Sequence, residues 1–290
     1  MNNYAFFTET TCDCSPELYE EMGAVALPLT FTINGKQYKD YADCREMNSH
    51  EFYEKMRAGE SCTTSQLSTA EIIEAIEPEV KAGKEIFYLA FSSGLSGTCQ
   101  SANIAANELR EKYPDCVIEV VDSLLASMGE GLFAWYCGMK LKNGESVRDV
   151  AKWARENVQN FVAWFTVDDL MFLKRGGRLS GGVAIVGTVL GIKPVLHMDE
   201  VGHLVNMMKV RGRKASLNAL VDRYEKTAVD RENNVVFVSH GDSYEDCKYV
   251  ADKIKALGAK EVHIGTIGPV IGSHSGPGTI ALFFVTDNAR

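Results

Sequence analysis

The residues best suited to chemistry lie in one turn, 92–98, which reads Ser-Ser-Gly-Leu-Ser-Gly-Thr. The turn carries four hydroxyl groups and two glycines in seven positions. It follows an apolar run, 86–91, typical of a buried strand, and precedes a stretch that predicts a helix reaching about Tyr113. This order leaves backbone N–H groups and the positive end of a helix dipole free to bind an anion. Because capping the helix needs only one hydroxyl, we expect an anion site here.

Part of the same turn matches the nucleophile elbow G-x-S-x-G of serine hydrolases. Residues 94–97 fit, but a threonine occupies the place of the final glycine. The alternative function is therefore an esterase-like serine hydrolase, in which Ser96 works with His274 or His240 and with an acid such as Asp122. The chain contains no P-loop signature, so a nucleotide phosphate is not the expected anion.

Composition limits the class of protein. The 290 residues are 46% hydrophobic and 24% charged, which is typical of a globular protein with two domains or one large one. A formal net charge of −9 argues against a general nucleic-acid-binding protein, which needs a basic face. The most apolar stretch, 124–141, is interrupted by Glu130 and by glycines. It predicts a buried helix and not a transmembrane segment.

The cysteines and the N-terminal residues favour a cytoplasmic protein without a metal. Eight cysteines accompany no secretory signal pattern, so we expect them to be cytosolic thiols. Cys12 and Cys14 form a C-x-C pair, but no second pair or histidine lies at zinc spacing. We therefore expect neither a metal nor a cofactor.

The order of the predicted elements divides the chain in two. Strands and helices alternate over residues 1–159, which predicts a layered α/β domain with a largely parallel sheet. Over residues 160–290 hairpins stand beside helices, which predicts an α+β domain. The run 25–33 is β-like, and 268–278 is expected to be a loop. Local signals predict helix starts at Ser15-Pro16, Asn48, Ser68 with Glu71 and Ser146 with Asp149, and a type I′ hairpin at Asn34-Gly35.

Four segments, taken together and in order, resemble the bacterial DegV family. The resemblance spans nearly the whole chain, and 193–194 and 209–214 also fit. The four segments are 64–66 with Ser68, 92–98 with 100–102, 173–180, and 267–272 with His274 and 276–278.

The resemblance implies a two-domain α/β protein that holds one long-chain fatty acid, such as palmitate, in a buried apolar tunnel between its domains. It implies a protein that is not itself an enzyme. Some relatives are the acyl-binding subunit of a fatty acid kinase, in which a separate kinase protein phosphorylates the bound carboxylate. The family's carboxylate contacts fall here on Thr64, on Ser96 or Ser93, and on His274.

Two basic clusters on this acidic chain favour a docking role, because local patches of opposite charge steer association. Arg175 and Arg178 lie in a glycine-rich loop, and we expect them to engage an acidic kinase partner. Arg211, in the second cluster, is the basic residue expected to face the ligand. Transient contact with a membrane surface is a further expectation.

Overall fold

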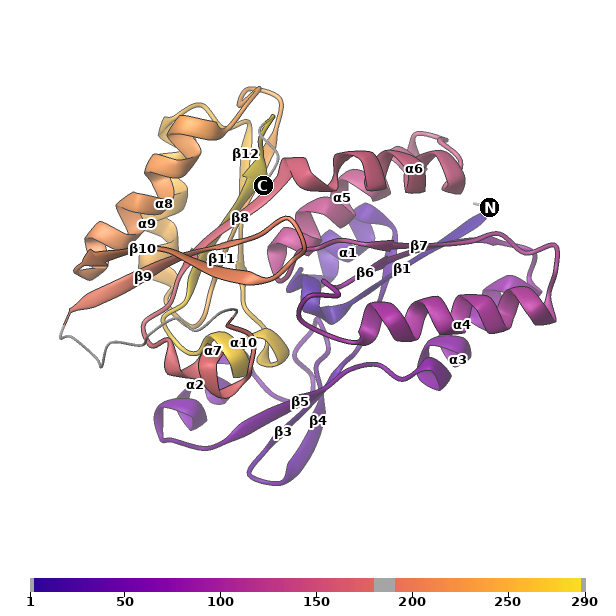
Figure 1. Ribbon diagram of the computed structural model, residues 1–290, viewed down its shortest axis with the longest axis horizontal. Coiled ribbons are helices and arrows are strands. Elements are labelled where there is room, and N and C mark those ends of the chain that lie inside the picture. Colours follow the sequence, from indigo (N-terminus) through magenta and orange to yellow (C-terminus); the bar gives the residue numbers. More distant parts are fainter. Residues whose placement is uncertain (1–2, 180–190, 288–290) are drawn as a thin grey trace.

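The computed structural model describes residues 3–179 and 191–287, and it arranges them in alternating layers of helix and sheet (Figure 1). Sheet A has the strand order β2-β1-β6-β7, and every neighbouring pair in it is parallel. The predicted α/β half with a parallel sheet is therefore confirmed. Its strands are β1 (Tyr4–Glu9), β2 (Ala24–Leu27), β6 (Glu85–Ala90) and β7 (Ile118–Asp122).

Sheet C belongs to the second half of the chain and has the order β10-β9-β8-β13-β11-β12. Its neighbours are antiparallel except for β11 and β12, so the predicted α+β character is confirmed. Its strands are β8 (Phe161–Thr166), β9 (Ile192–Met198), β10 (Leu204–Arg211), β11 (Val235–His240), β12 (Glu261–Thr266) and β13 (Ile280–Val285).

A small antiparallel sheet B, with β3 (Thr30–Ile33), β4 (Lys36–Lys39) and β5 (Cys62–Ser65), was not expected as a separate unit. The run 25–33 divides between β2 and β3, because Pro28 lacks the N–H that a continuous strand would need. The hairpin between β3 and β4 has φ values of 49° at Asn34 and 77° at Gly35. These are the positive φ angles of the predicted type I′ turn.

The helices begin largely where the sequence predicts. Ser15, Asn48, Ser68 and Ser146 each accept a hydrogen bond from the first turn of a helix, and Ser68 with Glu71 completes a capping box. The helical elements are η1 (Thr10–Cys12), α1 (Pro16–Met22), α2 (Ser49–Arg57), α3 (Thr69–Lys81), α4 (Thr98–Lys112), α5 (Met128–Lys142), α6 (Val147–Asn157), η2 (Val158–Asn160), α7 (Met171–Arg175), α8 (Arg213–Thr227), α9 (Tyr244–Ala256) and α10 (Pro269–Ser275).

Two expectations about helices were wrong. Helix α5 starts at Met128 and not near residue 124, because Leu124 and Ser127 adopt positive φ angles of 51° and 54° that a right-handed helix cannot contain. The expected loop 268–278 contains α10. Its first turn is fixed from a distance, since the carboxylate of Asp40 accepts a hydrogen bond from the Val270 N–H at 3.2 Å.

Helix α5 lies between the two main sheets, as its apolar sequence predicts. Helices α3 and α4 cover one face of sheet A, α5 and α6 cover the other, and α8 with α9 cover the outer face of sheet C (Figure 1). The contacts of α5 are close: a Cβ added to Gly129 would lie 2.6 Å from the Phe283 ring. Sheets A and B precede residue 160 and sheet C follows it, and we keep a division into 1–159 and 160–290 as a proposal.

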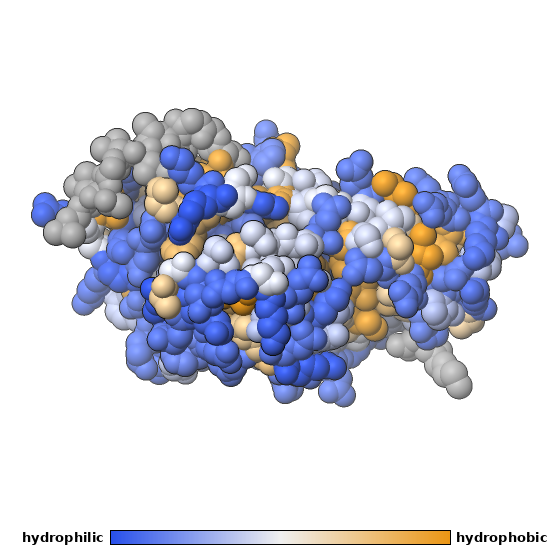
Figure 2. Space-filling model, turned by 90° about the horizontal axis from the view of Figure 1, so that it is seen from below, coloured by the Kyte–Doolittle hydropathy of each residue, from blue (hydrophilic) through white to orange (hydrophobic). Residues whose placement is uncertain are grey.

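Few large hydrophobic side chains are exposed among the residues that the structure describes. On the face drawn in Figure 2, hydrophobic residues form patches that hydrophilic residues separate. Among residues 3–179 and 191–287, no helix has both the length and the apolar composition needed to cross a membrane.

Candidate functional site

A cavity of about 450 Å³ opens between the inner face of sheet C and the elements α10, β5 and the turn 92–98. Both halves of the chain contribute to its wall, so only the folded protein can form it. Most of the lining side chains are apolar, including Leu29, Phe91, Phe165, Met198, Leu204 and Phe283.

Polar residues that are far apart in the sequence meet in the wall of this cavity. Thr64 Oγ1 lies 2.8 Å from His274 Nε2, although 210 positions separate the two residues. Strand β5 turns alternate side chains toward α10, so that Cys62 contacts Ser273 at 2.8 Å while Thr64 contacts His274. The structure thus brings together two of the predicted head-group contacts.

The His274 imidazole is held neutral. Burial, and then the positive charge of Arg178, lower its pKa to about 4. Its Nδ1 atom is buried with no hydrogen-bond partner among the described residues, and a Cβ added to Gly176 would lie 2.3 Å from that atom. An unpaired nitrogen costs less without its proton, so we assign the proton to Nε2. His274 then donates to Thr64, and the Thr64 hydroxyl is left to donate its own proton to a ligand.

The two alternative serines have different positions. Ser96 lines the cavity, and its Oγ accepts a hydrogen bond from the Thr98 N–H at 3.3 Å. It therefore also satisfies one free N–H in the first turn of α4, whose N-cap residue is Gly97. Ser93 is exposed and does not line the cavity, and its N–H donates to Asp122 at 3.2 Å. The structure therefore brings Ser96 to the site.

Of the three candidate arginines, one lines the cavity and two are exposed. Arg178, predicted to dock a partner, lines the cavity and donates hydrogen bonds to the carbonyl oxygens of Leu95 at 3.2 Å and Gly176 at 2.5 Å. Arg175 is exposed, and its guanidinium lies 4.7 Å from the centre of the Phe172 ring. Arg211, predicted to face the ligand, is exposed at the end of β10 and does not line the cavity. The basic residue at the cavity is therefore Arg178.

The serine hydrolase alternative lacks its geometry in residues 3–179 and 191–287. Ser96 Oγ lies 3.1 Å from the Thr98 hydroxyl, and the Nε2 atom of His274 faces Thr64. His240 lines a different cleft, and its Nδ1 accepts a hydrogen bond from a backbone N–H at 3.2 Å. Asp122 accepts backbone N–H groups and contacts neither histidine. The described residues form no Ser–His–Asp relay.

A buried pair of carboxyl groups behind the cavity wall was not anticipated from the sequence. Glu9 accepts hydrogen bonds from the Tyr88 hydroxyl at 2.8 Å and the Phe91 N–H at 2.7 Å, while Glu130 accepts one from Thr11 at 3.0 Å. Burial raises the pKa of both acids, and their mutual hydrogen bond fits a shared proton. Since Phe91 and Thr11 line the cavity, the pair fixes part of its wall.

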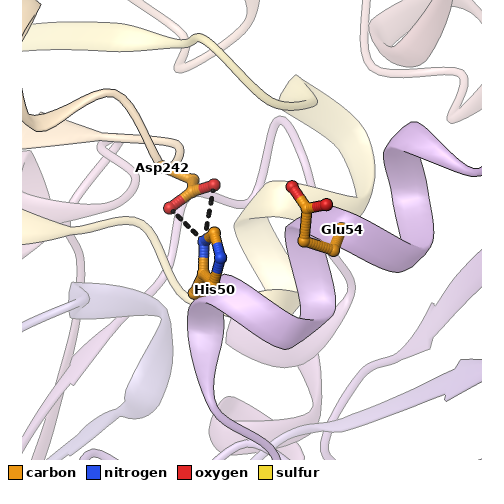
Figure 3. Close-up of side chains that lie close together, drawn as sticks. All are labelled: His50, Glu54 and Asp242. Carbon is orange, nitrogen blue, oxygen red and sulfur yellow. Dashed lines mark hydrogen bonds and ion pairs between the residues drawn. The ribbon is translucent and has the colours of Figure 1, made fainter.

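His50, Glu54 and Asp242 lie close together on the surface and could in principle hold a cation (Figure 3). His50 Nδ1 lies 3.0 Å from Asp242, and Figure 3 shows the two side chains facing each other. The guanidinium of Arg57 pairs with both carboxylates, so a positive charge is already present. The expectation that the protein binds no metal stays a prediction.

The geometry can be compared with known proteins. A family model described as "Uncharacterised protein, DegV family" matches residues 3–287. This chain belongs to the DegV family. The expectation drawn from the four motifs is therefore confirmed.

Other DegV-family sequences align along the full chain. A DegV domain-containing protein of Clostridium perfringens is 40% identical over 288 residues, which cover 99% of each chain. A DegV domain-containing protein of Streptococcus pyogenes is 34% identical, again over 99% of each chain.

Solved DegV-family structures share the fold. A DegV family protein from Thermus thermophilus, described for its fatty acid binding, has a TM-score of 0.88 and 29% identity, covering 98% of this chain and 99% of its own. DegV from Bacillus subtilis, described as a fatty acid binding protein, has a TM-score of 0.85 and 27% identity, covering 99% and 100%. These matches support the fold over nearly the whole length of the chain.

Proposed function

We propose that this DegV-family protein binds one long-chain fatty acid, palmitate or a similar acid, in the cavity between sheet C and α10. The carboxylate would lie among Thr64, Ser96, Arg178 and His274, which we call the head-group residues. The observation that carries the proposal is the combination of an apolar cavity with a Thr64 hydroxyl that His274 orients and a guanidinium in its wall. The fatty acid binding reported for the related proteins of known structure supports it.

The apolar wall suits an alkyl chain in size and in energy. A volume of about 450 Å³ is within the usual range of small-molecule sites. Burying a methylene contributes about 0.8 kcal/mol, so roughly fourteen methylenes contribute about 11 kcal/mol before association costs are subtracted. Those costs are about 4–15 kcal/mol. The head-group contacts therefore decide whether binding is tight.

The head-group residues offer the donors that a carboxylate needs. Thr64 has a free proton because His274 donates to its oxygen, and Arg178 supplies a fixed positive charge. Hydrogen bonds to an ionised group are roughly twice as strong as neutral ones. Ser96 already accepts a bond from the start of α4, so its hydroxyl proton is the part available to the ligand. Thr64, Ser96 and Arg178 can therefore donate to an anion without a metal, and His274 orients the Thr64 hydroxyl.

The proposal extends to a partner. We infer that the protein does not act on its ligand alone but presents the carboxylate to a separate fatty acid kinase. Arg175 supports this: it is exposed, and it lies three residues before Arg178, which lines the cavity. An acidic partner surface that docked on Arg175 would come close to the head group. Transient contact with a membrane surface during ligand exchange belongs to the same proposal.

The first experiment is mass spectrometry of a lipid extract from the purified protein, followed by calorimetric titration with palmitate. We expect a bound fatty acid, and we expect Thr64→Val and His274→Ala to weaken palmitate binding while the exposed Ser93→Ala does not. An extract without lipid, together with no uptake of palmitate, would refute the proposal. Ester hydrolysis that disappears in Ser96→Ala would instead favour the hydrolase.

A further inference from the structure

The cavity contains a second set of hydroxyl groups that are not head-group residues. Thr11, Ser127, Ser275 and Thr279 all line it. A plain alkyl chain offers no hydrogen bond, so a hydroxyl beside it stays unsatisfied unless the protein supplies a partner. The partners of these four side chains therefore indicate what the ligand must provide.

Ser275 has an unused hydroxyl. The residue is only 6% exposed, and its Oγ has no hydrogen-bond partner among the described residues. Ser273 in the same helix behaves differently, since its hydroxyl donates to the Pro269 carbonyl at 2.6 Å. A buried hydroxyl without a partner costs about 1–3 kcal/mol, and an oxygen atom on the ligand would remove that cost.

The other three hydroxyls have already given their protons to acceptors within the protein. Their oxygens can still accept a hydrogen bond, but they cannot donate one into the cavity. A ligand O–H could use them, whereas a carboxylate, which only accepts, could not. The donated bonds run from Thr279 to the carbonyl oxygens of Ser275 and Gly276, from Ser127 to Asp13, and from Thr11 to Glu130.

One of these four hydroxyl residues is the neighbour of a head-group residue in the sequence. Ser275 follows His274 directly in α10. At the other end, Ser127 Oγ lies 3.1 Å from the hydroxyl of Ser239, and Ser239 pairs in register with Ala281 in the cavity wall. A hydroxyl on one of the first carbons of a bound acid would meet Ser275 before any other residue of the set.

We propose that the preferred ligand is a long-chain fatty acid with a hydroxyl group close to its carboxylate, and that Ser275 is the partner of that hydroxyl. This inference rests on the proposed function, because it assigns a second polar group to the same ligand. A hydroxy fatty acid such as 3-hydroxypalmitate would satisfy both polar parts of the cavity.

Displacement of a fluorescent fatty acid from the full chain tests the proposal, with palmitate, 3-hydroxypalmitate and 16-hydroxypalmitate as competitors. We expect 3-hydroxypalmitate to bind about 5- to 150-fold more tightly than palmitate. We expect 16-hydroxypalmitate to gain nothing. Ser275→Ala should abolish the preference for the 3-hydroxy acid over palmitate, while the matched control Ser273→Ala should retain it.

Equal binding of palmitate and 3-hydroxypalmitate by the parent protein would overturn the proposal, and so would a preference that survives Ser275→Ala. If Ser275→Ala does not fold, the comparison of the 3-hydroxy and 16-hydroxy acids on the parent protein decides alone. Failure of all three acids to bind would refute the proposed function, and is therefore distinguishable from failure of this inference.

Discussion

Adding one methyl group at Gly176 tests whether the position of His274 controls ligand binding. The backbone of Gly176 has φ −70° and ψ −12°, which alanine adopts without strain. The new Cβ would lie 2.3 Å from Nδ1 of His274, where ordinary contacts are 3.4–4 Å. The imidazole must therefore move by about 1 Å, which disrupts its 2.8 Å contact with Thr64.

We expect Gly176→Ala to weaken palmitate binding by about 1–3 kcal/mol, which is roughly 5- to 150-fold. The affinity should fall because the displaced imidazole no longer orients the Thr64 O–H toward the carboxylate of the ligand. The melting temperature should fall only modestly, because the substitution fits the backbone and the clash is confined to the His274 ring. Calorimetric titration measures the affinity and a melting curve checks the fold.

A double-mutant cycle sharpens the test. His274→Ala removes the ring that the new methyl group would contact, so Gly176→Ala should have almost no further effect in that background. If the losses of palmitate affinity were additive in the double variant, Gly176→Ala would act through a group other than His274. The assignment of His274 as the group that orients Thr64 would then be wrong.

The other predictions use the same binding assay, a phosphorylation assay with the kinase, or a melting curve. Ser96→Ala should weaken palmitate binding by about 1–2 kcal/mol, while Ser93→Ala leaves it unchanged. A loss of affinity in Ser93→Ala alone would instead place the carboxylate at Ser93. Arg175→Glu should slow kinase-dependent phosphorylation at low salt without altering palmitate affinity, and an unchanged rate would exclude this residue from docking. Burial raises the pKa of Asp40 to about 7, so its ionisation destabilises the fold as pH rises from about 4 to 7. The change in melting temperature caused by Asp40→Asn should therefore be more favourable at pH 8 than at pH 4.5. An equal change at the two pH values would contradict the explanation that a buried Asp40 carboxylate destabilises the fold.

Local signals in the sequence were sufficient for much of the secondary structure. The capping box of Ser68 and Glu71 and the hairpin at Asn34-Gly35 formed as predicted, because their hydrogen bonds and φ angles involve only neighbouring residues. The alternation of strands and helices likewise indicated a parallel sheet in the first half. Four scattered motifs were enough to indicate the family.

Contacts between distant segments decided the rest. Helix α10 starts at Pro269, and the Val270 N–H in its first turn donates a hydrogen bond to Asp40, which the neighbouring residues in the sequence do not reveal. Ser93 and Ser96 have similar local sequences, and only the packed turn shows which of them reaches the cavity.

The chemistry of the site is likewise a product of the tertiary structure. The sequence by itself supplied Thr64, Ser96 and His274 as candidates, because their types and motifs suit an anion. Only the fold lowers the His274 pKa to about 4, since burial beside Arg178 removes the water that would stabilise the charged imidazole. Only the fold turns Arg178 into the cavity wall and leaves Arg211 exposed, because side-chain direction depends on what packs around each residue.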